Sequence, residues 1–145
     1  MIGRMLAIAC VLTFCASVSL SAQVKAKHAG IDVTVTELKK IKEFKVPGAG
    51  PPYTPGPYVA KPDHDLAVVT FEANQEIKLD DHGARVVLVD AQGQEHRKIC
   101  SQTAFYEKGN VKVVALFEVP ERAILRTLKL DETVIDVLKL STSAK

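Results

Sequence analysis

The stretch Ala84–Glu95, ARVVLVDAQGQE, decides the fold. Val86–Val89 is an unbroken apolar run, rich in β-branched residues, and Asp90–Gly93 has the composition of a tight turn. An apolar run of this length that ends in Asp and Gly predicts a buried strand followed by a turn. We therefore expect the other apolar runs of the chain to be its partners in a sheet.

Further strands are predicted along the chain, because short apolar or alternating runs recur between turn sequences and no helical pattern exceeds two turns. The clearest runs are Ile31–Thr36, Asp65–Ala73, Glu95–Ala104, Val111–Val119 and Ile124–Leu130. Glu37–Val46 predicts a strand continuation or a short turn, followed by a second short strand. Val134–Leu140 predicts a strand or a helical turn, and Gln23–Ala29 an irregular leader. The expected core includes Val68, Phe71, Val87, Val89, Val113, Ala115 and Phe117. About seven short strands of this kind predict an all-β sandwich or barrel.

The N-terminal segment has the order of a secretory signal peptide. Arg4 precedes an apolar run from Met5 to Leu12, and small residues follow, including Ser19 and Ser21. The run is shorter than the roughly 20 apolar residues that a transmembrane helix needs. Cys15 follows the bulky Phe14, which disfavours a lipoprotein anchor. We expect residues 1–21 to be the signal peptide and 22–145 one domain, periplasmic or secreted, with no membrane span.

Charge and cysteine content narrow the function classes. The net charge is +2, and it falls to +1 when residues 1–21 are removed, since Arg4 is their one charged residue. A net charge this close to zero gives no strongly basic surface of the kind that binds nucleic acid. Of three cysteines only Cys100 remains, so the expected product has no internal disulfide and is a monomer. We interpret Cys100 as a small buried residue of a strand.

A proline-rich segment, 47–63, interrupts the pattern of strands. It contains six of the seven prolines, together with Tyr53 and Tyr58. Proline lacks the donor that a central strand requires, so we expect a long loop. Two interpretations stay open. Tyr53 and Tyr58 could form a partner-binding surface, because tyrosine gives large amphipathic contacts at low entropic cost. Alternatively, the segment is a solvated connector.

No catalytic residue or cofactor site is predicted. The groups Asp63–Asp65 and Asp80–His82, and also His96, supply metal-ligand types, but neither group has the spacing of a known zinc or calcium site. There is no G-x-S-x-G sequence and no glycine-rich phosphate loop. We therefore expect neither metal nor cofactor, and no enzyme activity, with an unrecognised hydrolase as the residual enzyme hypothesis.

The order of the predicted elements resembles a known family. The stretches that resemble it are IDVTVTEL (31–38), DLAVVTFEAN (65–74), RVVLVDAQGQE (85–95) and YEKGNVKVVALFEVPERA (106–123). Together they resemble a bacterial immunoglobulin-like envelope domain family of unknown function, whose fold is shared with a secreted mycobacterial antigen. The resemblance implies an exported, immunoglobulin-like antiparallel β-sandwich and no particular activity. The proline-rich segment departs from that family.

These observations give two functional hypotheses of different classes. The first is a non-enzymatic interaction module that binds an unknown envelope protein or surface component. The second is a periplasmic protein that binds a small ligand or a metal. A concave pocket with converging polar groups would favour the second hypothesis.

Overall fold

The computed structural model describes residues 22–45, 57–79 and 83–143. The expected signal peptide, Tyr53 and the group Asp80–His82 lie outside these residues. Within them, every strand pairing is antiparallel. The predicted fold class, an all-β antiparallel sandwich, is confirmed.

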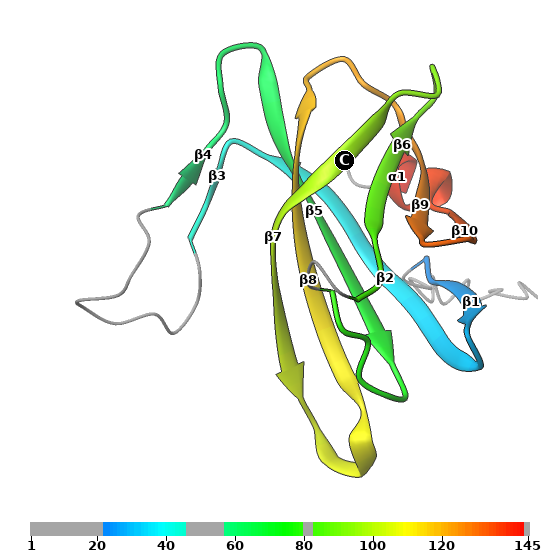
Figure 1. Cartoon of the computed structure of the whole chain (residues 1–145). Coiled ribbons are helices and arrows are strands. Elements are labelled where there is room, and N and C mark those ends of the chain that lie inside the picture. The colour runs from blue at the N-terminus through cyan, green and yellow to red at the C-terminus, as the bar shows by residue number, and fades with distance from the viewer. Residues whose placement is uncertain (1–21, 46–56, 80–82, 144–145) are drawn as a thin grey trace, which may run out of the picture.

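The first sheet contains five strands in the order β1-β2-β5-β8-β7 (Figure 1). Their bounds are β1 Val24–His28, β2 Ile31–Ile41, β5 His64–Ala73, β8 Val111–Pro120 and β7 Glu95–Phe105. The expected irregular leader at Gln23–Ala29 is wrong, because Val24–His28 pairs along its whole length with Ile31–Val35. Ala29 and Gly30 close this hairpin with φ values of 48° and 80°, as a two-residue turn requires.

The second sheet continues from the first through β7. The start of β7, up to Arg97, pairs with β6, and the rest of β7, from Lys98, pairs with β8. The order then runs β7-β6-β9-β10, with bounds β6 Val86–Asp90, β9 Leu125–Leu130 and β10 Thr133–Asp136. A short helix, α1 (Leu138–Ser143), follows β10, so both expectations for Val134–Leu140 are met in succession.

The core lies between the two sheets. In β8, the five residues of one parity, Val111, Val113, Ala115, Phe117 and Val119, are all buried in it. Of the predicted core residues, only Val89 is not buried but half-buried. The register of β6 with β9 shifts between Val89 and Asp90. At the start of β9 the side chain that faces the core is therefore that of Leu125, and Ile124, which the alternation had placed there, is 58% exposed.

A separate two-stranded ribbon, β3 (Glu43–Phe44) and β4 (Tyr58–Val59), projects beside the first sheet (Figure 1). We call residues 43–44 and 58–60 the arm. The expectation of a loop throughout 47–63 is wrong at Tyr58–Val59, because the antiparallel partner at Glu43–Phe44 gives this short stretch a ladder despite the neighbouring prolines.

Candidate functional site

The arm covers part of the outer face of the first sheet, the face turned away from the second sheet. Three outer-face residues, Leu66, Val68 and Leu116, are at most 2% exposed, although they lie outside the main core. The partly buried residues packed against them are Ile41, Phe44, Tyr58, Ala60, Cys100 and Val114. The sheet therefore carries a second apolar cluster, and the arm is its cover.

The cover leaves a pocket of about 210 Å³ beside Tyr58. Its lining comes from the arm, β7 and β8, namely Phe44, Tyr58, Cys100, Ser101, Gln102, Val114 and Leu116. We call it the outer-face pocket. The structure thus brings together Tyr58 and Cys100, and no sequence pattern had connected these two residues.

Tyr58 and Cys100 both line the pocket and pack against the same apolar cluster. A hydrogen bond with the Cys100 thiol, and to a lesser extent burial, raises the pKa of the Tyr58 hydroxyl above its ordinary value. The described residues that line the pocket include no His, Lys or Arg that could activate the thiol as a nucleophile. The arrangement is therefore suited to holding an apolar group, with the phenol and thiol as its polar end.

Cys100 is half-buried and lies at the wall of the pocket. It belongs to an 11-residue strand and follows an irregularity in the ladder between Lys98 and Cys100. Cys100 lies in a strand, as predicted, but the prediction that it is buried is wrong, because the outer face at this point is only partly covered.

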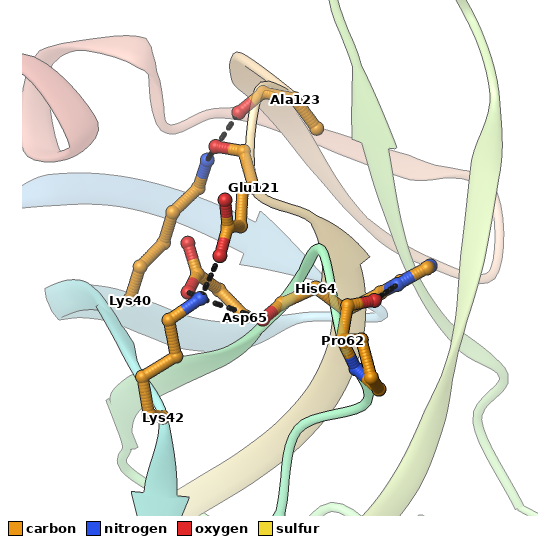
Figure 2. A network of polar contacts seen from close by, with 7 residues as sticks. All are labelled: Lys40, Lys42, Pro62, His64, Asp65, Glu121 and Ala123. Carbon is orange, nitrogen blue, oxygen red and sulfur yellow. Dashed lines mark hydrogen bonds and ion pairs between the residues drawn. The ribbon is translucent and has the colours of Figure 1, made fainter.

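A polar network holds the chain where it leaves β2 for the arm (Figure 2). Lys42 Nζ lies 2.7 Å from Asp65 Oδ1, donates to the His64 carbonyl oxygen at 2.9 Å and is paired with the Glu121 carboxylate. The hydrogen bonds to Asp65 and then Glu121 raise the pKa of Lys42. Ala60 N also donates to Lys42 O at 2.9 Å. Both strands of the arm are thereby fixed to the sandwich at its base.

Figure 2 also shows the contacts of His64 and Asp65, two of the candidate metal ligands. His64 Nδ1 lies 2.9 Å from the Pro62 carbonyl oxygen, and the Asp65 carboxylate is occupied by Lys42. Asp63 adopts a turn conformation with a φ of 63°. Among residues 22–45, 57–79 and 83–143, no three His, Cys, Asp or Glu side chains are placed to hold one metal ion.

His96, the remaining candidate, forms a buried pair with Asp90. His96 Nε2 is 3.0 Å from Asp90 Oδ2, and both side chains are at most 7% exposed. Asp90 Oδ1 accepts hydrogen bonds from the Gln92 and Gln94 backbone N–H groups at 2.9 and 3.0 Å. This carboxylate is fully used in closing the β6–β7 turn, so we assign the pair a structural role.

A larger hollow of about 440 Å³ lies elsewhere on the surface. It is lined by Asp32, Thr34, Glu72, Ala73, Asn74, Tyr106 and Asn110. Asp32 and Asn74 are bonded to each other within it: Asn74 Oδ1 accepts from Asp32 N at 3.0 Å, and Asn74 N donates to Asp32 O at 3.3 Å. These bonds join the ends of β2 and β5, so the polar groups of Asp32 and Asn74 already serve a structural purpose. We therefore take the outer-face pocket as the better candidate site.

The comparisons with known proteins support the fold alone. No known protein family and no curated protein sequence matches the chain. A crystal structure of an uncharacterised β-sandwich protein from Clostridium difficile 630 is similar, with a TM-score of 0.50 and 10% identity, over 77% of this chain and 87% of that one. No helix in the described part of the chain is long and apolar enough to cross a membrane.

Proposed function

We propose that this chain is an exported, non-enzymatic, immunoglobulin-like interaction module of the bacterial envelope. Its outer-face pocket would receive one apolar side chain of a partner protein. The observation that carries the proposal is the second apolar cluster, which the arm covers only in part, leaving the pocket between Tyr58 and β8. The sequence of residues 1–21 and the family resemblance support export and the envelope.

The size of the pocket favours a protein side chain over a small-molecule ligand. Sites for small molecules and cofactors usually enclose about 300–1,000 Å³. The outer-face pocket encloses about 210 Å³. Protein interfaces commonly depend on a few apolar or aromatic anchors that fill small pockets of this kind. The alternative, a protein that binds a small ligand, would have to use another site, such as the hollow of about 440 Å³ beside Asp32 and Asn74.

An NMR titration with toluene, an analogue of a phenylalanine side chain, tests the pocket directly. We expect toluene to shift the amide resonances of Cys100, Val114 and Leu116. Val114→Trp fills the pocket and should abolish these shifts. Val134→Trp, the same change at a valine that is 62% exposed on β10, should leave them intact. Unshifted resonances at saturating toluene would refute the pocket as a binding site.

A pull-down from envelope extract then tests whether the pocket binds a protein. Bait carrying Val134→Trp should capture the same protein as the parent, and bait carrying Val114→Trp should not. Equal capture by all three would place the recognition surface elsewhere.

The prediction that Tyr53 and Tyr58 bind the partner is tested by changing each to Ser. Tyr58 packs against the sheet, so Tyr58→Ser is expected to lower stability as well as binding.

The N-terminus of the exported protein tests the expected signal peptide. We expect mass spectrometry of the periplasmic or secreted fraction to find a chain that begins at Ala22 or Gln23. Either cleavage leaves Val24–His28 intact, so β1 is preserved. Retention of Met1, or a lipid on Cys15, would contradict the expectation.

A further inference from the structure

The outer face of the first sheet is polar at the end away from the arm (Figure 1). Glu72 has the same parity along β5 as Leu66 and Val68, so its side chain lies on the outer face. It is directly opposite Thr34 of β2 and Lys112 of β8, and residues opposite each other share a face. The hollow of about 440 Å³ lies on this polar surface, lined from the ends of β2 and β5 and from the turn between β7 and β8.

The hollow contains polar side chains that the fold does not use. The bonds between Asp32 and Asn74 fix one wall. Within the part of the chain that the structure describes, no hydrogen bond or ion pair engages the side chains of Thr34, Glu72 and Asn110. These three side chains offer a hydroxyl, a carboxylate and an amide, and so supply both donors and acceptors. Such a set suits a ligand with several hydroxyl groups, because each hydroxyl both donates and accepts.

Tyr106 adds an aromatic surface to the hollow. Its side chain is 57% exposed and belongs to the lining. The Tyr106 N–H donates to the Asn110 carbonyl oxygen at 2.8 Å and closes a turn in which Lys108 and Gly109 have φ values of 64° and 78°. This turn fixes the backbone of the tyrosine beside the hollow. An exposed phenol ring has an apolar face and a polar tip, so it can stack on the C–H face of a sugar ring while its hydroxyl stays in water.

The charges around the hollow favour a neutral ligand. Lys27 Nζ lies 3.8 Å from Asp32 Oδ1, and Glu72 is directly opposite Lys112 in the ladder of β5 and β8. Each carboxylate of the lining therefore has a lysine beside it, and the surface selects neither a cation nor an anion. The volume lies within the range of about 300–1,000 Å³ that is usual for small-ligand sites.

We infer that this hollow binds one ring of a neutral oligosaccharide. The face of the sugar stacks on Tyr106, and its hydroxyl groups bond to Thr34, Glu72 and Asn110. The site is separate from the outer-face pocket, since the two share no lining residue. The carbohydrate is therefore a second ligand, additional to the protein side chain proposed for the pocket.

An NMR titration with neutral trisaccharides tests the inference. Maltotriose, cellotriose, mannotriose, galactotriose and tri-N-acetylchitotriose cover the common ring configurations. We expect at least one of them to shift the amide resonances of Thr34, Glu72 and Asn110, and to leave those of Cys100 and Leu116 in the outer-face pocket unchanged. Because the toluene titration has the opposite pattern, the two sites can fail independently. Added sodium chloride should not weaken binding of a neutral ligand.

Substitutions at two neighbouring aromatic residues locate the site. Tyr106→Ala should weaken binding by about tenfold, because the stacking surface is lost. Tyr106→Trp keeps an aromatic ring and should retain binding. Phe105→Ala is the matched control, since Phe105 is 66% exposed but does not belong to the lining, and this variant should bind like the parent.

Three outcomes would overturn the inference. Resonances of the hollow that stay unshifted by every trisaccharide at millimolar concentration would show that it is not a carbohydrate site. Equal affinity of the parent and a folded Tyr106→Ala variant would show that the tyrosine does not stack on the ligand. An equal loss of affinity in Phe105→Ala would place the sugar elsewhere on the β7–β8 turn.

Discussion

Asp90 shows at the scale of one residue how a buried charge can organise a turn. Its carboxylate accepts hydrogen bonds from two backbone N–H groups and lies within hydrogen-bond distance of His96. The hydrogen bond with His96 lowers the pKa of Asp90, with the Gln94 and Gln92 amides acting in the same direction. The carboxylate is therefore ionised at neutral pH, and His96 Nε2 is the donor of the pair.

Asp90→Asn should destabilise the protein in a pH-dependent manner. At pH 7 we expect a loss of about 1–3 kcal/mol, because the buried partners lose a charged acceptor. A depressed pKa stabilises the fold above the unfolded pKa of about 3.9, and this contribution disappears as the pH falls through the folded pKa. Urea denaturation should therefore show that the difference between parent and variant shrinks below pH 4. Glu132→Gln, in an exposed turn, is the control; a difference independent of pH would contradict this account.

Tyr58 should control the reactivity of Cys100. The tyrosine ring packs against the outer-face cluster, and the neighbouring Cys100 thiol raises the pKa of its hydroxyl. Tyr58→Ala should therefore increase the rate of thiol labelling severalfold at constant pH, while Tyr58→Phe, which keeps the ring, should have a smaller effect. Labelling with a chromogenic disulfide measures both rates. Equal rates in all three proteins would mean that the ring does not shield the thiol.

The two residue pairs differ in how far the sequence could have predicted them. Asp90 and His96 flank a recognised turn, six residues apart, so a hairpin drawn through Asp90–Gly93 would have placed them together. Tyr58 and Cys100 belong to segments separated by two strands. Their contact depends on the arm folding back over the outer face, which no local pattern of the sequence encodes.

At the scale of elements, β8 is the strand that the sequence predicted best. Its alternation of apolar residues places Phe117 in the core, fully buried. Phe117→Ala should cost about 3–5 kcal/mol through the cavity it leaves. Phe105→Ala removes the same side chain from a position that is 66% exposed, and should change stability by less than about 0.5 kcal/mol. Denaturation at low protein concentration measures both, and similar losses would mean that the strand is misassigned.

The arm is the element that depends most on polar contacts. Lys42→Met removes the ion pairs with Asp65 and Glu121 that hold its base. We expect faster amide exchange at Phe44 and Ala60, with little change in the central strands. Because the pKa of Lys42 is raised, its contribution is complete below the unfolded pKa of about 10.4 and is lost as the pH rises through the folded value. Lys39→Met is the control, and exchange that matches it would show that the network does not hold the arm.

Short elements escaped the sequence interpretation because their local signals are weak. The sequence VKAKH of β1 alternates, but Ala26 is small and His28 is polar. The alternation was therefore too weak to predict a strand, and an irregular leader was expected instead. The strand is defined instead by the Ala29–Gly30 turn and the strong strand that follows. Tyr58–Val59 is a strand only because Glu43–Phe44 lies beside it, and the prolines around it correctly predicted that this stretch is not a central strand.

At the level of the whole molecule, the two sheets are joined on one side by the long strand β7. On the other side they are joined by the contact between β1 and β10, which we call the seam. β7 belongs to both sheets on one side of the sandwich. On the opposite side β1 meets β10, where the His28 side chain is 12% exposed and His28 Nε2 lies 3.9 Å from Asp131 Oδ2. Sequence periodicity predicted the layers of the sandwich, because burial sets the alternation within each strand. It could not predict this closure, which depends on single polar contacts between residues that are 105 positions apart.

Thr133→Val tests whether the seam closes the sandwich. The substitution keeps the shape of the side chain but removes the hydroxyl that lies 2.8 Å from His28 Nδ1, and it leaves that nitrogen without its partner. We expect a loss of about 1 kcal/mol in the free energy of unfolding. Amide exchange should accelerate together in β1 and β10, and not in β5 or β8, because the seam would open before the central strands. Thr127→Val, at a partly buried threonine of β9, is the matched control. Exchange that accelerates in β10 alone would show that β1 is held by its hairpin with β2, and that the contact between the sheets contributes nothing to closure.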